Sequence, residues 1–327
     1  MVEGRNGVTG SASRETSLHT PTARMDAKRL GVYGLLLFVV VMWGGSFVAA
    51  RVVLSAESPG AATLTPTMLA TVRFLIASVI FLPILYRQHT RVKPLRLSDV
   101  PFFLMLGQLG ISIYFWLQYT GVQLTNAGIS SVIVVGLIPL ATMVISGVTL
   151  HEPLGSKQAL SLALGAVGVV IVVSQKALLG VAAESGFLLG TLCLIANAVT
   201  FAVYSALIRG IRERYASLTI TAGMTISGTI GLLLLSAFTE KWGALGALSV
   251  TQWGAIIFLA VVCSVMGYFF YNYALSQVEA SKAAVWIYLE PPVAVVFGAL
   301  LLGEFVAPQT VLGGLVILAS LYFTQRS

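Results

Sequence analysis

Ten long segments of mostly apolar residues divide this chain of 327 residues. A helix needs about 20 such residues to cross roughly 30 Å of hydrocarbon. The composition is 57% hydrophobic and 9% charged, whereas soluble domains are about one quarter charged. The sequence therefore predicts an all-α integral membrane protein with ten transmembrane helices. They lie at approximately 31–50, 66–86, 101–121, 127–148, 159–175, 186–208, 217–238, 253–273, 283–303 and 308–324.

The lysines and arginines lie mainly in the short segments between these spans, so the net charge of +7 is a topology signal and does not indicate nucleic-acid binding. With the N-terminus in the cytoplasm, fifteen of them lie inside and three outside, and Arg73 lies within a span. The three outside are Arg51, Lys176 and Lys241. Because cytoplasmic loops carry the basic excess, we expect a multi-pass protein of the inner membrane with both termini cytoplasmic. The lipid bilayer is then its surroundings and nucleic acid is not a partner.

Residues 1–29 contain no apolar stretch and are rich in Ser, Thr, Gly and Arg. This composition predicts a disordered cytoplasmic tail rather than a signal peptide. Met25 directly precedes the first span, which raises the hypothesis that translation begins there.

Two halves of the chain carry the same markers in the same order. Pro139 precedes Glu152 by thirteen residues, and Pro291 precedes Glu304 by the same thirteen. Further markers are Tyr119 and Gln123 against Tyr273 and Gln277, and Trp43, Ser46 and Arg51 against Phe201, Tyr204 and Arg209. We therefore predict two five-helix repeats, residues 30–175 and 176–327.

An odd number of spans turns the second repeat upside down relative to the first. Two inverted halves can exchange conformations around one central site, which is the basis of alternating access in transporters. The alternative is a duplicated scaffold without transport.

Glu290 lies in the ninth span directly before Pro291 and Pro292. Proline removes backbone donors, a defect tolerated in a membrane only inside protein or beside a wet cavity. On a continuous helix, Trp286 and Glu290 would share one face and point inward together. Glu290 is thus the leading candidate for contact with a substrate or with a coupling proton. The alternative is a carboxylate that only holds its span in place. Pro139 marks the equivalent helix break in the first half.

Arg73 is the second charged residue within a span. At 1.5 Å per residue it lies about 10 Å below the outer end, and Glu290 lies about 10 Å above the inner end of its own span. The sequence therefore does not imply a direct ion pair, although span ends that are uncertain by two to four residues leave room for one. Arg73 either takes part in coupling, or reaches toward the membrane surface or bonds between helices.

Aromatic side chains are numerous enough to line a cavity for an organic molecule. Cavity candidates are Trp43, Ser46, Trp116, Phe201, Tyr204 and Trp286, with further tyrosines at 119, 268, 271, 273 and 288. Some of these, Tyr119 and Tyr273 above all, fit an aromatic belt at the membrane interface as well. Gly44 and Gly45 favour close helix packing.

Glu152 and Glu304 end the repeated spans on opposite sides of the membrane. Their equivalent positions indicate a structural role, such as satisfying backbone groups at the boundary of a repeat. A gating role is the alternative.

The sequence contains no pattern typical of a metal, cofactor or enzyme site. Cys193 and Cys263 lie in separate apolar runs, and His19, His89 and His151 are scattered. No nucleophile with a base, and no phosphate-binding loop, occurs in the short loops. We therefore expect neither a cofactor nor an enzymatic activity.

The chain resembles the drug/metabolite transporter superfamily, specifically its EamA-type ten-span exporters. The resemblance covers residues 31–325 and rests on WGGSF at 43–47, on Arg73-Phe74, and on the two Pro-to-Glu stretches that end in HEPL and LGEF. It implies two inverted five-helix repeats around a cavity lined by spans 1, 3, 4, 6, 8 and 9, and the export of amino acids or related metabolites. Ile138 stands where the second half has Glu290, so any coupling group is asymmetric.

Three functional hypotheses follow from the sequence. The first is export of a small metabolite, with or without proton coupling. The second is efflux of drugs or organic cations, favoured by the aromatic residues and a lone carboxylate. The third is a non-transporting membrane scaffold. A homodimer is compatible with each of them.

Overall fold

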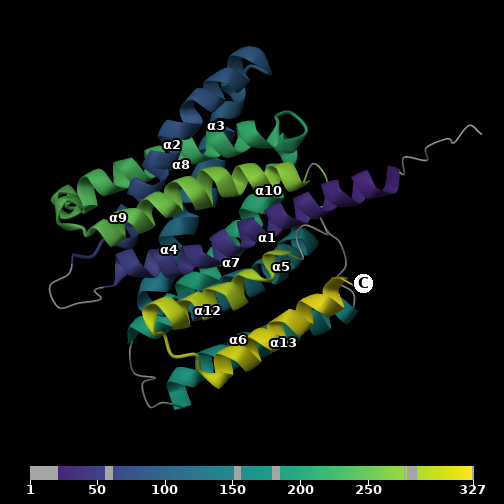
Figure 1. Ribbon diagram of the computed structural model, residues 1–327, viewed down its shortest axis with the longest axis vertical. Helices are drawn as coiled ribbons and strands as arrows, with labels where there is room; N and C mark the ends of the chain where they lie inside the picture. The colour runs from purple at the N-terminus through teal and green to yellow at the C-terminus, as the bar shows by residue number, and fades with distance from the viewer. Residues whose placement is uncertain are drawn as a thin grey trace, which may run out of the picture.

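The computed structural model (Figure 1) describes residues 21–55, 62–150, 156–178, 185–275, 277 and 286–325. The regular structure of these residues is helical throughout, without strands. The first half comprises α1 (Pro21–Leu54), α2 (Pro66–Arg91), η1 (Leu97–Asp99), α3 (Val100–Gly107), η2 (Gln108–Ile113), α4 (Tyr114–Leu124), α5 (Ala127–Leu150) and α6 (Ser156–Leu178). The second half comprises α7 (Ser185–Arg212), α8 (Ser217–Thr239), η3 (Trp242–Ala247), α9 (Val250–Ile257), η4 (Phe258–Met266), α10 (Gly267–Leu275), α12 (Glu290–Leu302) and α13 (Pro308–Gln325).

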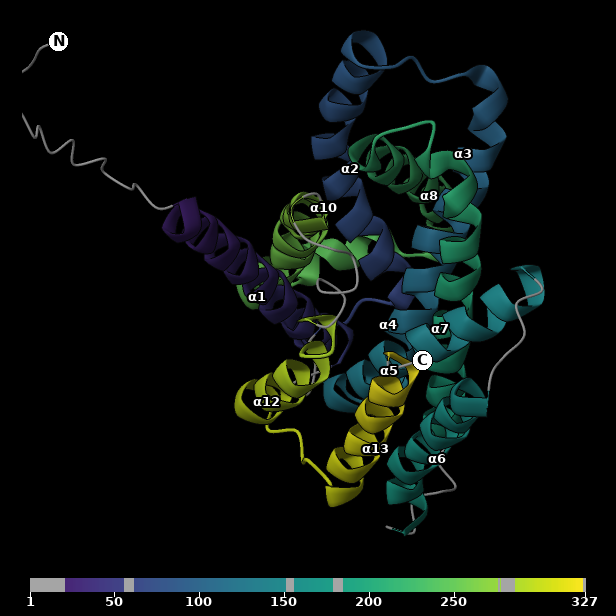
Figure 2. The same ribbon diagram turned by 90° about the vertical axis from the view of Figure 1, so that its right-hand side faces the viewer.

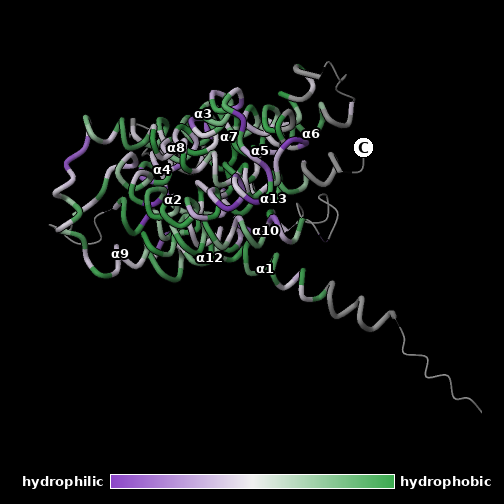
Figure 3. The backbone as a smooth tube through the Cα atoms, turned by 90° about the horizontal axis from the view of Figure 1, so that it is seen from above, coloured by the Kyte–Doolittle hydropathy of each residue, from purple (hydrophilic) through white to green (hydrophobic). Residues whose placement is uncertain are grey.

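These elements follow the ten predicted spans. Seven helices of the described chain are long and apolar enough to cross a membrane, and three shorter apolar helices lie at Leu162–Val172, Glu290–Leu302 and Pro308–Ser320. Figure 3 shows hydrophobic residues along most of the helical backbone. The all-α membrane fold is thereby confirmed.

Helix α1 begins earlier than the sequence suggested, because residues 21–29 are helical. Proline is favoured at the first position of a helix, and Ala, Met, Lys and Arg, which follow, are good helix formers. The expectation of a disordered tail up to residue 29 is therefore wrong for this part. The rest of the tail lies outside the described residues.

The two repeats are inverted, as the pairing of α2 with α8 demonstrates. Thr71 on α2 donates to the carbonyl of Leu232 (3.4 Å), and three residues later the carbonyl of Phe74 accepts from Thr229 (3.1 Å). Residue numbers rise along α2 as they fall along α8, so these equivalent helices are antiparallel. A two-fold axis in the membrane plane requires this arrangement.

Helices α6 and α13 form a second antiparallel pair at one end of the molecule (Figures 1 and 2). They approach most closely at two glycines. A Cβ on Gly168 would lie 2.9 Å from the carbonyl oxygen of Gly313, and a Cβ on Gly313 would lie 2.6 Å from that of Gly168. Small residues that let two backbones meet are a frequent device in membrane helices.

The packing around the axis is only partly symmetric. Helix α5 packs on α7 as its counterpart α12 packs on α1, and α4 packs on α7 as α10 packs on α1. Both α6 and α13 also pack on α5, whereas no comparable packing on α12 occurs in the part of the chain that the structure describes. The α6–α13 pair is therefore displaced toward one half.

Each half contains a π-helical segment within its third span. η2 lies between α3 and α4, and η4 lies at the same place between α9 and α10. These wider turns bring glycines against large rings. A Cβ on Gly110 would lie 2.9 Å from the ring of Tyr204, and one on Gly267 would lie 2.6 Å from Nε1 of Trp43.

The prolines act differently in the two halves. α5 continues through Pro139, so the expected helix break there is wrong. α12 begins at Glu290 with Pro291 and Pro292 in its first turn, after a turn at residues 288–289. One proline removes one donor, which a helix tolerates with a kink, whereas two in succession favour the start of a new helix.

Candidate functional site

Arg73 lies in the centre of the bundle, and its side chain links the two repeats. The residue is 4% exposed. Its Nε donates to the hydroxyl of Ser264 on η4 (2.9 Å), and Nη1 donates to the hydroxyl of Tyr119 on α4 (2.5 Å). The guanidinium carbon lies 4.5 Å from the ring centroid of Phe115 and 5.0 Å from that of Phe74. Arg73 therefore bonds between helices and does not reach toward the membrane surface.

This guanidinium has no carboxylate partner among the residues that the structure describes. The ion pairs found among the described residues are Arg51 with Glu304 and Arg214 with Asp99. The partners of Arg73 are neutral hydroxyls and aromatic rings, which stabilise a cation without cancelling its charge. Arg73 is also the one buried lysine or arginine of the residues whose burial is described.

Glu290 is a buried acidic residue on the second repeat, as Arg73 is a buried basic residue on the first. The residue is 6% exposed, and its carboxylate makes no hydrogen bond or ion pair with any residue that the structure describes. An isolated buried carboxylate is costly in an apolar surrounding.

The start of α12 is held against α1 by the glycine pair. A Cβ on Gly44 would lie 2.8 Å from the Cβ of Val293 and 2.9 Å from the carbonyl oxygen of Glu290. Gly45 faces the ring of Phe297. Val293 and Phe297 therefore lie on the face that α12 turns toward α1.

The two charges lie near the same groups without touching each other. Tyr114, Cys263 and Tyr268 each lie within electrostatic range of both Arg73 and Glu290. Ser264, which binds Arg73, adjoins Cys263, whose carbonyl accepts from Nε1 of Trp43 (3.0 Å). Trp43 in turn adjoins Gly44. Among the described residues no ion pair joins Arg73 to Glu290, a question that the span boundaries predicted from sequence had left open.

Aromatic rings surround this centre on both halves. Trp43 contacts Tyr268 and Tyr271, with ring centroids 5.9 and 5.2 Å apart. Phe201 contacts Tyr114 and Tyr204 at 5.7 and 5.8 Å.

The remaining cavity candidates, Ser46, Trp286 and Trp116, make contacts that are separate from these rings. Ser46 donates to the carbonyl of Trp43 within its own helix (2.6 Å). Trp286 stacks on Tyr33 of α1, with centroids 5.8 Å apart. Trp116 is 41% exposed and makes no ring contact within the described chain. The structure does not bring it to the centre. Tyr119 is buried against Arg73, so the belt interpretation of this residue is wrong.

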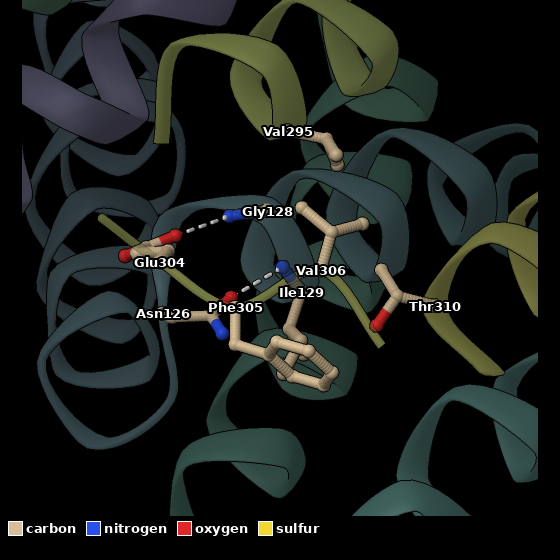
Figure 4. A pocket seen from close by; sticks show the side chains of 8 residues that line it. All are labelled: Asn126, Gly128, Ile129, Val295, Glu304, Phe305, Val306 and Thr310. Carbon is tan, nitrogen blue, oxygen red and sulfur yellow. Dashed lines mark hydrogen bonds between the residues drawn. The ribbon is translucent and has the colours of Figure 1, made fainter. Parts of the chain in front are cut away.

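Glu304 caps a helix of the other repeat. Its carboxylate accepts from the backbone amides of Ala127 and Gly128 at the start of α5, at 3.0 and 3.3 Å. Figure 4 shows this carboxylate beside Asn126, whose side chain accepts from the amide of Ile129. Arg51 lies 4.0 Å away and also donates to the carbonyls at the end of α4. Glu152, the equivalent residue, lies outside the described part of the chain.

A groove of about 270 Å³ opens between α12 and α13, with α5 as its floor. It is almost wholly apolar and includes Gly136, Pro291, Val295 and Gly314. The groove occupies the place where the displaced α6–α13 pair leaves α12 uncovered.

Sequence reasoning missed Ser264, Phe115 and Cys263 as neighbours of the charges. Hydroxyl and aromatic residues are common in membrane spans, and nothing in the local pattern sets these apart. The internal repeat does not single them out either, because Ser264 and Ser112 are out of register by the spacing that relates Tyr119 to Tyr273 in the same span.

Comparison with known families decides the class of protein. Residues 30–174 and 188–326 each match the EamA-like transporter family. The chain belongs to this family. The EamA-like match falls once on each half, in agreement with the repeated sequence markers.

Several EamA-like relatives align over most of the chain. An uncharacterized transporter of Bacillus subtilis is 27% identical, covering 82% of this chain and 85% of its own. An uncharacterized transporter of Archaeoglobus fulgidus is 26% identical, covering 89% and 98%. A protein of Streptantibioticus cattleyicolor named "probable terminal-alkyne amino-acid exporter" is 25% identical, covering 89% and 92%. One crystal structure, 16% identical, aligns with a TM-score of 0.58 over 90% of this chain and 96% of that one, and supports the fold alone.

Proposed function

We propose that the protein is a secondary transporter that exports small metabolites, amino acids or related compounds, across the inner membrane by alternating access. Its family consists of transporters, and one relative is named as an amino-acid exporter. The observation that carries the proposal is the pair of buried charges, Arg73 and Glu290, between two inverted repeats; neither forms an ion pair with a residue that the structure describes. Such repeats bind their substrates near the bilayer midplane, where the halves meet.

Contacts between loops support the grouping of loops into two opposite sides, and the basic residues assign one of these sides, with the termini, to the cytoplasm. Asp99, before α3, accepts from Arg214 (2.9 Å) and from Tyr215 (2.8 Å) in the loop before α8. Both loops are assigned to the cytoplasm by their basic residues. Gln252, at the start of α9, donates to the carbonyl of Ala62 (2.6 Å), and both of these residues are assigned to the outer side.

The test is efflux from vesicles that contain the purified protein. Vesicles are loaded with an equimolar mixture of the twenty amino acids, and external amino acids are measured by mass spectrometry over time. We expect at least one of them to leave faster than from protein-free vesicles. Efflux that matches the protein-free rate for every amino acid would contradict export of this class. Repeating the assay with and without a pH gradient distinguishes proton coupling from facilitated export.

Efflux of organic cations is a second candidate. The aromatic rings of Trp43, Tyr268 and Tyr271, with a carboxylate that has no ion pair in the described part of the chain, are a typical surrounding for a quaternary amine. The vesicle assay is repeated with tetraethylammonium and larger aromatic cations in place of amino acids. Release of these cations would favour organic-cation efflux over amino-acid export. A scaffold without transport predicts instead that no loaded compound leaves and that Glu290→Gln changes no phenotype.

A further inference from the structure

We propose that the connection between α2 and α3 binds the phosphate groups of anionic phospholipids in the cytoplasmic leaflet. This basic surface comprises residues 86–97, and its cationic residues are Arg87, Arg91, Lys93 and Arg96. Figure 2 shows the connection at the edge of the molecule, where it joins the ends of α2 and α3. Lipid binding there does not depend on which compound the protein transports.

The four cationic side chains of the basic surface are exposed. They make no hydrogen bond or ion pair with any residue that the structure describes. Lys93 has an aromatic neighbour, with Nζ 5.7 Å from the ring centroid of Tyr215. Asp99 is buried and already accepts from Arg214 (2.9 Å) and Tyr215 (2.8 Å), while Glu213 forms no ion pair with the surface. The positive charges are therefore not neutralised within the described chain.

Hydrogen bonds hold the backbone of the basic surface in place. The amide of Leu95 donates to Nδ1 of His89 (3.0 Å), and the amide of Arg96 donates to the hydroxyl of Tyr215 (3.1 Å). Tyr215 belongs to the other repeat and precedes α8. Because the backbone is fixed before an anion arrives, binding costs less conformational entropy.

Apolar side chains accompany the cations. Leu97 is 89% exposed, and Tyr86 and Val92 are exposed as well. Apolar side chains beside lysine and arginine are typical of a surface at the membrane interface, where the apolar groups reach acyl chains and the cations reach phosphates. This combination fits a lipid better than it fits a soluble acidic protein.

Helix α2 carries the basic surface to the depth of the lipid headgroups. The helix has 26 residues and is about 39 Å long at 1.5 Å per residue. The hydrocarbon core is about 30 Å thick, and headgroups bring the bilayer to about 40–45 Å. With Pro66 at the outer boundary of the core, the end of α2 reaches the opposite headgroup layer at any tilt up to about 40°.

The equivalent connection of the second repeat lacks the positive charge. It joins α8 to α9, and its charged residues, Glu240 and Lys241, are adjacent and of opposite sign. Phe238 and Val250 are exposed there, so the apolar part of the surface is present in both repeats. Because the repeats are inverted, the two connections face opposite leaflets. Recognition of anionic lipid is therefore expected on one side of the membrane.

The test is thermal unfolding of the purified protein in detergent with three added compounds. They are dioctanoyl phosphatidylglycerol, dioctanoyl phosphatidylcholine and glycerol phosphate, which has the headgroup chemistry without acyl chains. We expect phosphatidylglycerol to raise the unfolding temperature most, with a binding constant at least about tenfold above that of phosphatidylcholine. Each basic residue near an anionic surface strengthens binding by about fivefold.

Variants locate the effect. Joint substitution of the four cations, Arg87→Gln, Arg91→Gln, Lys93→Gln and Arg96→Gln, should abolish the preference for phosphatidylglycerol. Lys241→Gln, in the equivalent connection, is the matched control and should keep it. Arg91→Gln alone should reduce the preference about fivefold, which keeps the test available if the joint variant does not fold. Raising the salt from about 0.1 M to 1 M, which shortens the Debye length from about 10 to 3 Å, should also reduce it.

Four outcomes would overturn the lipid surface. Equal stabilisation by the two lipids, or a preference that survives the joint substitution, shows that these cations do not recognise anionic lipid. Glycerol phosphate that stabilises as much as phosphatidylglycerol indicates a soluble phosphate compound instead. Decaglutamate that does so indicates an acidic protein partner.

Discussion

Gly44 is the residue at which α1 and α12 come closest. Its missing side chain allows Val293 and the carbonyl of Glu290 to approach, and any Cβ would have to displace backbone. The position of Glu290 thus depends on a glycine, which has no functional side chain.

Replacing this glycine should destabilise the protein. We expect Gly44→Ala to lower the free energy of unfolding by about 1–3 kcal/mol, as over-packing does. Gly34→Ala on the same helix is the control, because nothing lies within 4 Å of a Cβ there. It should be neutral or gain up to about 1 kcal/mol, since alanine is the better helix former. Thermal unfolding of both variants checks this, and equal effects would contradict the close contact.

The identity of the two charged residues was predictable from sequence, whereas their partners were not. An arginine or glutamate within an apolar run is conspicuous because a charge in a membrane is expensive. Ser264 and Tyr119 are not conspicuous, because hydroxyls in a helix can bond to their own backbone. Ser46 and Thr120 do so here.

At the scale of elements, Glu304 joins the end of α12 to the start of α5. The first amides of a helix lack partners within the helix, and an acceptor that supplies them stabilises it. Here the acceptor comes from the opposite repeat.

Removing this cap should loosen the contact between the repeats. We predict that Glu304→Ala lowers the free energy of unfolding by about 1–2 kcal/mol, the usual effect of a lost cap. Glu213→Ala, at an exposed glutamate, should have little effect. Hydrogen exchange at Ala127 and Gly128 should rise in the first variant alone, and unchanged protection there would contradict the capping role.

Two adjacent glycines of α13 should respond in opposite ways to the same substitution. Gly313 meets Gly168, so Gly313→Leu should lower the unfolding temperature strongly. Gly314 faces the apolar groove, where its nearest neighbour would be 3.7 Å from a Cβ. Gly314→Leu should therefore fold normally, yet slow efflux several-fold, because a side chain in the groove keeps α12 and α13 apart. Wild-type efflux from Gly314→Leu would mean that the groove stays open throughout the cycle.

Hydropathy located the spans but not the irregular turns within them. A π-helical segment changes the hydrogen-bond pattern without changing the composition, so η2 and η4 leave no apolar signal. The start of α12 at Glu290 was partly visible, because two consecutive prolines mark a helix start more clearly than the single Pro139 marks a break.

At the scale of the whole molecule, the inverted topology was predictable because an odd number of spans requires it. The displacement of α6 and α13 toward α5 was not, since both repeats offer related surfaces. The pair could pack on α5 or on α12 with similar energy. The difference depends on individual side-chain contacts, and a sequence pattern does not give their energies.

The topology itself can be tested with single cysteines in a variant without Cys193 and Cys263. Ser98→Cys and Glu213→Cys should react with a membrane-impermeant maleimide only after the cytoplasmic face is exposed. Thr63→Cys and Gly243→Cys should react in intact cells, since all four positions are exposed in the structure. Residues 63 and 213 precede the equivalent helices α2 and α8, so labelling of both from the same side would contradict the inverted arrangement.

The bond from Glu304 to α5 has a consequence for the resting state. If the outer ends of the two repeats separate during the cycle, this cap breaks each time, at about 1–2 kcal/mol. Because 1.4 kcal/mol corresponds to a tenfold ratio of populations, one carboxylate would bias the empty carrier roughly tenfold toward the form that is shut to the exterior. An exporter at rest would then wait with its entrance toward the cell's interior, where its cargo is made.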